Sequence, residues 1–237
     1  AQGHIPGAVF FDIDAIADRA SDLPHMLPSP ADFAAAAGAL GLRREAAVVV
    51  YDAQGLFSAP RVWWTLRVMG FPRVVVLDGG LKAWRAEGRP VETAPAALPA
   101  VPLEPAFEPA LVRDLDAVRS ALASGVEVVD ARAAARFLGE APEPRPGLPS
   151  GHMPGARNVP WSRLVQPDGR MADPERIRAA FAGIDLNAPM VTTCGSGVSA
   201  ALLALALARL GRFDVAVYDG SWTEWAARPD TEIVTGA

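Results

Sequence analysis

Two stretches of the chain repeat each other, and this repeat limits the possible folds more than any other feature of the sequence. Residues 3–12 read GHIPGAVFFD, and residues 151–160 read GHMPGARNVP. Farther along each copy, VVVLDGGLKAW at 74–84 corresponds to VAVYDGSWTEW at 215–225. Because the same two motifs occur twice in the same order, the sequence indicates two modules of one fold.

Each copy alternates short β-branched runs with longer runs that have the spacing of helices. The expected elements are strands over 47–51, 73–77, 126–129, 189–193 and 213–218, and helices over 58–69, 81–87, 114–123, 174–182 and 199–210. Alternation of this kind implies parallel strands with helices on both faces. We therefore expect an α/β fold of two repeated modules, each a mainly parallel sheet covered by helices.

The repeat and the composition also predict module boundaries. We expect a first module over 1–88, a proline-rich linker over 89–110 and a second module over 111–237. In the second module a predicted helix and strand come before His152, whereas only three residues come before His4. By its own repeat, the first module is expected to lack its first strand and helix.

The chain's single cysteine, Cys194, directly follows the strand predicted over 189–193. A lone cysteine is most often a small buried apolar side chain. Here, however, it stands at the carboxyl end of a strand, where open α/β sheets form their sites. The turn that follows lets main-chain N–H groups point inward and precedes a helix N-terminus, so it suits an anion and favours the nucleophilic thiolate. The predicted anion loop comprises Gly195, Ser196, Gly197, Val198 and Ser199.

Composition narrows the classes of function. A chain of 237 residues that is 51% hydrophobic can bury a sizeable core. One cysteine excludes an internal disulfide and a cysteine metal site, which favours a reducing, cytoplasmic compartment. The net charge of −5 argues against nucleic acid as a partner. The longest apolar run, over 200–208, is too short to span a membrane.

Several separate motifs carry a family resemblance. The paired GHxPGA motifs, the paired DG…W motifs, the cysteine loop of the second module alone and the segment RFLGEAPEPRPGLPSGHMPGARNVPW over 136–161 resemble the tandem-domain rhodanese sulfurtransferases. The loop CGSGVS over 194–199 is similar to that of the mercaptopyruvate sulfurtransferases, which usually reads CGSGVT. Thiosulfate-specific members usually carry two basic residues after the cysteine, where this chain has Gly195 and Ser196.

The loop predicts a chemistry in which the Cys194 thiolate takes a sulfur atom from a donor, becomes a persulfide and passes the sulfur to an acceptor. The loop amides would stabilise the negative sulfur. The resemblance implies that Ser196 is catalytic together with Cys194. No cofactor and no metal are expected, because sulfur itself is the group carried. From composition alone, Arg136 and Arg145 read as exposed charges on a proline-rich loop; the resemblance implies instead that they hold an α-keto acid, since guanidinium groups suit a carboxylate and a polarised ketone.

The first module is expected to be non-catalytic. Its segment over 48–64 aligns with 190–204, which puts Asp52 opposite Cys194, and a carboxylate cannot accept sulfur. His4 and His152 most simply hold the turns of the two GHxPGA motifs. The resemblance also makes His4 a candidate for a proton relay to Ser196.

Four further residues carry less information. Trp63 and Trp64 lie in the helix predicted over 58–69, where packing is a more common role than substrate contact. Glu140 and Glu143 stand between the two arginines and receive no role.

A thiol in an anion-binding loop is also compatible with two other functions. A cysteine phosphatase needs an arginine six residues after the cysteine, and this chain has Ala200 there. A non-catalytic module that only carries sulfur or binds partners is opposed by the intact loop and by Arg136 and Arg145. The sequence thus predicts a sulfurtransferase that moves sulfur from 3-mercaptopyruvate to a thiol such as thioredoxin or to cyanide, with thiosulfate as the alternative donor and no nucleic acid or membrane partner.

Overall fold

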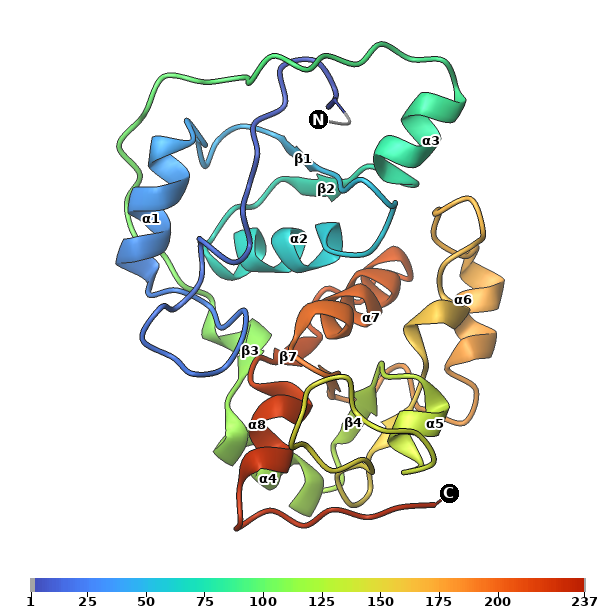
Figure 1. Cartoon of the computed structure of the whole chain (residues 1–237). Coiled ribbons are helices and arrows are strands. Elements are labelled where there is room, and N and C mark those ends of the chain that lie inside the picture. The colour runs from blue at the N-terminus through green and yellow to red at the C-terminus, as the bar shows by residue number, and fades with distance from the viewer. Residues whose placement is uncertain (1–2, 237) are drawn as a thin grey trace. The chain divides into compact units, whose positions relative to one another are not determined.

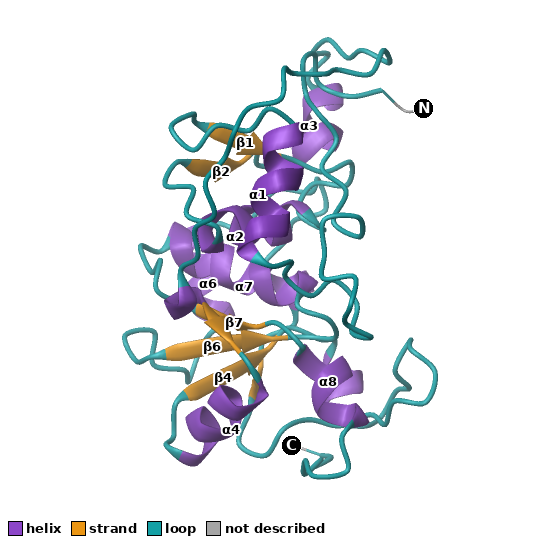
Figure 2. Ribbon diagram, turned by 90° about the vertical axis from the view of Figure 1, so that its left-hand side faces the viewer, coloured by secondary structure: helices purple, strands orange, loops and turns teal. Residues whose placement is uncertain are grey.

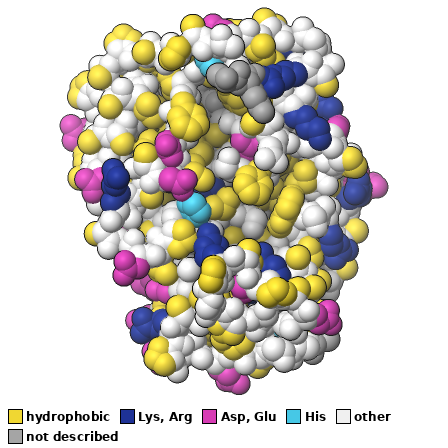
Figure 3. Space-filling view, viewed as in Figure 1, with side chains coloured by type: hydrophobic (Ala, Val, Ile, Leu, Met, Phe, Trp, Pro, Cys, Tyr) yellow, Lys and Arg dark blue, Asp and Glu magenta, His cyan; other side chains and the backbone are white. Residues whose placement is uncertain are grey.

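The structure is a computed structural model that describes residues 3–236 (Figure 1). The chain divides into two compact units. Unit 1 comprises Ala1–Glu108 with Pro167–Met171, and unit 2 comprises Pro109–Gln166 with Ala172–Ala237. Within the described residues, no helix is long and apolar enough to cross a membrane. On the face shown in Figure 3, basic and acidic side chains are interspersed.

Unit 2 is built on one five-stranded parallel sheet. Its strands, in the spatial order β3-β7-β6-β4-β5, are β3 (Val112–Arg113), β7 (Ala216–Tyr218), β6 (Met190–Thr193), β4 (Glu127–Asp130) and β5 (Arg157–Asn158). Its helices are α4 (Leu115–Ala123), α5 (Ala134–Phe137), α6 (Pro174–Ala180), α7 (Val198–Arg209) and α8 (Ser221–Ala227), with 3₁₀ turns over Pro109–Leu111 and Trp161–Arg163. Helices α4 and α8 cover one face of the sheet, and α6 and α7 cover the other (Figure 2).

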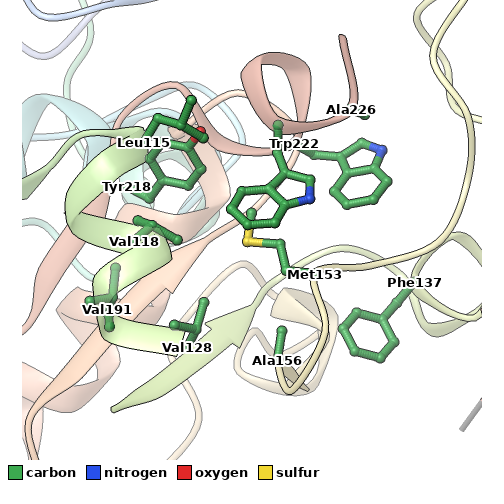
Figure 4. Packing of buried hydrophobic residues seen from close by; sticks show 12 residues of the cluster. Leu115, Val118, Val128, Phe137, Met153, Ala156, Val191, Tyr218, Trp222 and Ala226 are labelled. Carbon is green, nitrogen blue, oxygen red and sulfur yellow. The ribbon is translucent and has the colours of Figure 1, made fainter. Parts of the chain in front are cut away.

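Local sequence explains where these helices begin. The Asp114 side chain caps α4 by accepting the N–H of Ala117 at 2.9 Å. The Asp173 side chain caps α6, whose first residue is Pro174. Apolar side chains from α4, α8 and the sheet then form one core cluster, in which Trp222 is fully buried (Figure 4).

Unit 1 contains a two-stranded parallel sheet, β1 (Val48–Val50) and β2 (Val74–Val76). Its helices are α1 (Pro30–Ala39), α2 (Ala59–Val68) and α3 (Gly80–Ala86). Trp63 and Trp64 are buried, as expected of side chains that pack. Phe33, Leu66, Met69 and Phe71 belong to a core cluster in which α1 and α2 pack on the strands.

The sequence repeat is a structural repeat as well. Elements β1, α2, β2 and α3 follow one another in unit 1 as β6, α7, β7 and α8 do in unit 2. Val49 pairs in register with Val75, as Val191 pairs with Ala216. The first two are each 57% exposed, whereas Val191 is 2% exposed because α4 and α8 pack over that face. In the described part of unit 1 no strand or helix precedes α1; the expectation that this module lacks a first strand and helix stays a prediction.

The expected fold class is confirmed, and each expected strand and helix is present with small shifts at its ends. The strand expected over 213–218 is shorter, since only Ala216–Tyr218 is paired, and Phe213 is 56% exposed. Helices α1, α5 and α8 and strands β3 and β5 are not among the elements expected from the sequence.

The segment predicted as a linker, 89–110, makes main-chain hydrogen bonds within unit 1. Glu92 exchanges two with His4, and the N–H of Val101 donates to Gly38 at 2.9 Å. Residues 167–171 also belong to unit 1, where the N–H of Met171 donates to the Asp78 carboxylate at 2.7 Å. The boundaries at residues 88 and 111 stay a prediction.

Candidate active site

Cys194 lies between the end of β6 and the start of α7, as predicted. Only residues 195–197 separate it from the helix, and Gly197 caps α7 with a left-handed φ of 74°. The thiol is free and is 2% exposed. The short glycine-containing loop therefore holds the sulfur at the N-terminus of a twelve-residue helix.

The carbonyl groups of this loop are bound by α8. The carbonyl of Cys194 accepts the N–H of Trp222 at 2.9 Å, and the carbonyl of Gly195 accepts both the N–H and the hydroxyl of Thr223, at 3.0 and 2.6 Å. Within residues 3–236, the N–H groups of Gly195 and Ser196 donate to no protein acceptor. The loop thus offers donors suited to an anion.

Arg136 and Arg145 both approach the cysteine loop. Arg136 is the third residue of α5, and Arg145 lies in the segment that follows. A Cβ placed on Gly195 would lie 3.3 Å from Nη2 of Arg136 and 3.7 Å from Nη1 of Arg145. The fold therefore brings both guanidinium groups next to the residue that follows the cysteine, where a side chain at position 195 would crowd them.

A buried ion-pair network holds Arg136. The Glu143 side chain is 2% exposed and accepts hydrogen bonds from Arg132 at 2.8 Å and from Nε and Nη2 of Arg136. Arg132 is itself buried, pairs with Asp130 and lies 4.1 Å from the centre of the Trp222 ring. Glu143 received no role from the sequence. Its position between two arginines in RFLGEAPEPR is the sequence feature that could have indicated an ion pair.

The charges of this region do not cancel. Asp130 and Glu143 balance Arg132 and Arg136, whereas Arg145 makes no ion pair within residues 3–236. A net positive charge beside a thiol and free amides favours an anionic ligand.

The remaining loop residues lie where the sequence placed them. Ser196 is 7% exposed, and Ser199 is in the first turn of α7 and partly exposed. Val198 is the first residue of α7.

The two histidines are bound by main-chain carbonyls of their own units. His152 is buried, with Nδ1 2.8 Å from the carbonyl of Phe137 and its ring stacked on that of Phe137. His4 lies with Nδ1 3.0 Å from the carbonyl of Ile5 and Nε2 2.9 Å from that of Ala94. These carbonyls, that of Ile5 first, raise the pKa of His4 above its ordinary 6.5. Both histidines thus hold their turns, as the simpler interpretation expects.

Asp52 occupies the corresponding position of unit 1, after β1. Its carboxylate accepts five main-chain N–H groups of the loop that leads into α2, those of Gln54, Gly55, Phe57, Ser58 and Ala59. The unit 1 loop is therefore filled by an anion of the chain itself and carries no thiol.

The fold and the loop together define an α/β protein that presents a thiol among free amides at the end of a central parallel strand. The family model of the rhodanese-like domain matches residues 1–87 and 114–228. The chain belongs to the rhodanese family.

Individual relatives cover nearly the whole chain. A 3-mercaptopyruvate sulfurtransferase of Escherichia coli (strain K12) is 46% identical over 98% of this chain and 83% of its own length. Thiosulfate/3-mercaptopyruvate sulfurtransferase 2 of Arabidopsis thaliana is also 46% identical, over 98% of this chain and 75% of its own length. The crystal structure of SseA from Escherichia coli, a 3-mercaptopyruvate sulfotransferase, superposes with a TM-score of 0.84 at 44% identity and covers 93% of this chain and 83% of that one.

Proposed function

We propose that the chain is a sulfurtransferase that takes sulfur from 3-mercaptopyruvate, holds it as a persulfide on Cys194 and passes it to a thiol acceptor. One observation carries the proposal: Arg136 and Arg145 meet at Gly195, directly beside a free thiol whose loop has unoccupied amides. The names of the relatives agree with this activity.

In the first step, the thiolate of Cys194 attacks the sulfur atom of the donor. A sulfur–sulfur bond forms, and the carbon–sulfur bond of the donor breaks. The electron pair of the broken bond passes into the enolate of pyruvate, which then takes a proton at carbon. Arg136 and Arg145 would bind the donor carboxylate and stabilise the enolate oxygen.

In the second step, an acceptor thiolate attacks the outer sulfur of the persulfide. The acceptor becomes a persulfide, and the sulfur–sulfur bond to Cys194 breaks to restore the thiolate. Thioredoxin, small thiols and cyanide are the acceptors that we propose; cyanide would attack the same outer sulfur and leave as thiocyanate. In the first step the donor sulfur is oxidised and the donor carbon is reduced by the same two electrons, and in the second step the transferred sulfur keeps its oxidation state. No outside oxidant, reductant or cofactor is therefore needed. The amides of Gly195 and Ser196 would stabilise the negative sulfur throughout.

Thiosulfate is the alternative donor, and the printed name of the Arabidopsis relative includes it. Thiosulfate is a compact dianion, and a loop that receives it is expected to place cationic side chains beside the thiol. Gly195 and Ser196 supply none, so we propose 3-mercaptopyruvate as the preferred donor.

The other parts of the chain have supporting roles in this proposal. The first module, 1–88, is non-catalytic because Asp52 stands in place of the thiol. A proton relay through His4 stays a prediction. Both ring nitrogens of His4 lie within hydrogen-bond distance of main-chain carbonyls, and a relay would require one of them to leave that contact. A cytoplasmic location fits a chemistry that needs a free thiol and a thiol acceptor.

The test is the mass of the protein after incubation with each donor and without acceptor. The wild type should gain about 32 Da, the mass of one sulfur atom, and Cys194→Ser should gain nothing. The Ser120→Ala variant changes a serine of α4 that lies outside the cysteine loop and keeps the thiol, so it is the control and should gain the adduct. An adduct that persists in Cys194→Ser would refute the role of this cysteine.

A further inference from the structure

Ser221, the first residue of α8, has a backbone conformation that favours glycine. Its φ is +52°, and it is one of two non-glycine residues with a positive φ among residues 3–236. In this left-handed region a Cβ lies too close to the neighbouring carbonyl oxygen. A serine at this position is therefore expected to offset the backbone strain through hydrogen bonds of its hydroxyl group.

Unit 1 contains the matched position without the hydroxyl. Gly80 begins α3 as Ser221 begins α8, with a φ of +53°, in the motif DGG where unit 2 has DGS. A Cβ on Gly80 would lie 2.5 Å from the carbonyl oxygen of Asp52. In unit 1 the Asp52 carboxylate accepts the N–H groups of the corresponding loop, so a serine hydroxyl at position 80 is not needed to bind them.

The hydroxyl of Ser221 is fully occupied by protein groups. It donates to the carbonyl of Tyr218 at 2.8 Å and accepts the N–H of Gly197 at 3.0 Å, that of Cys194 at 3.2 Å and, at the longer distance of 3.4 Å, the hydroxyl of Thr193. A hydroxyl has one proton to donate and two lone pairs. Ser221 is also fully buried, so its hydroxyl has no capacity left for a substrate atom.

The two amides that Ser221 binds are at the two ends of the cysteine loop. Between them, the carbonyls of Cys194 and Gly195 are bound by α8. We propose that Ser221 is a positioning residue: its hydroxyl clamps both ends of the cysteine loop and thereby directs the N–H groups of Gly195 and Ser196 toward the sulfur on Cys194. This inference rests on the proposed function, in which Cys194 carries the sulfur.

The decisive variant is Ser221→Gly, because glycine removes the hydroxyl and also suits the left-handed backbone, so the protein should remain folded. With 3-mercaptopyruvate, kcat should fall by about ten- to a hundredfold while KM changes by less than about twofold, since Arg136 and Arg145 are untouched. The pH profile of Cys194 alkylation by iodoacetamide should move to higher pH. The control Ser124→Gly removes a hydroxyl that binds two carbonyls at the end of α4 and should leave all three quantities unchanged.

A kcat and an alkylation profile like those of the wild type in folded Ser221→Gly would overturn the inference. Should that variant not fold, amide hydrogen exchange in the wild type decides: the N–H groups of Cys194 and Gly197 should exchange at least about tenfold more slowly than those of Gly195 and Ser196. Equal exchange of the four amides would also overturn it. Failure of the proposed function can be told apart from failure of this inference, because in the first case the wild type itself would gain no sulfur adduct.

Discussion

Arg145 and Arg136 differ in how they are held, and this difference predicts different consequences of their removal. Arg145 makes no hydrogen bond or ion pair within residues 3–236, whereas Arg136 binds the buried carboxylate of Glu143. Both guanidinium groups approach Gly195. Arg145→Ala should therefore remove a contact to the donor alone, and Arg136→Ala should remove a contact to the donor and a structural ion pair.

The contacts of the two arginines set the expected changes in kcat/KM and in the free energy of unfolding. Loss of one charge-assisted contact to the donor costs about 1.5 to 3 kcal/mol, so each substitution should lower kcat/KM for 3-mercaptopyruvate roughly ten- to a hundredfold. Arg145→Ala should change the free energy of unfolding by less than about 0.5 kcal/mol. Arg136→Ala leaves the Glu143 side chain, 2% exposed, with Arg132 as its remaining partner. That loss should cost about 1 to 3 kcal/mol and lower Tm by about 2 to 12 °C.

The assay compares steady-state sulfur transfer from 3-mercaptopyruvate and from thiosulfate to one thiol acceptor, and thermal unfolding is followed by circular dichroism. The wild type should have the higher kcat/KM for 3-mercaptopyruvate, and Arg145→Ala should narrow the difference between the donors at unchanged Tm. A wild type that prefers thiosulfate would refute the choice of donor. An Arg145→Ala variant with unchanged kcat/KM would refute the role given to that side chain.

Three further predictions test the site and the packing. Gly195→Ala should lower kcat/KM about two- to tenfold without lowering Tm, because its Cβ would crowd the two guanidinium groups; steady-state kinetics with the wild-type control measures this. Val191→Ala should cost about 1 to 3 kcal/mol in urea unfolding, whereas Val49→Ala, at the equivalent exposed position, should cost less than about 0.5; equal costs would contradict the burial. Arg228 holds the pKa of Asp230 well below its ordinary 3.8, so this stabilisation is complete above pH 3.8 and is lost progressively on acidification toward the lower folded pKa; the Tm difference between wild type and Asp230→Asn should shrink steadily as the pH falls below 3.8.

Much of the fold could be predicted from the sequence, because short runs of neighbouring residues determine where most of its strands and helices lie. The repeat defined two related units, and the helical spacing over 114–123 located α4. Helix α8 was not predicted, since its first residue is a serine with a positive φ and no side chain caps it. It is stabilised instead by Trp222 and Trp225, which are buried in the core. Strands β3 and β5 have two residues each, too few to show a periodicity.

For the site, the sequence by itself determined the position of Cys194 at the end of a strand and the absence of a thiol from the first module, because strand ends and glycine turns are set by neighbouring residues. Only the tertiary structure decided which groups surround that thiol. Ser221 is 27 residues away from Cys194, and Glu143 lies in a charged, proline-rich stretch that read as solvated. Their roles arise from burial: packing removes water from Ser221 and Glu143, so each must satisfy its polar atoms on the protein groups that the fold brings within hydrogen-bond distance.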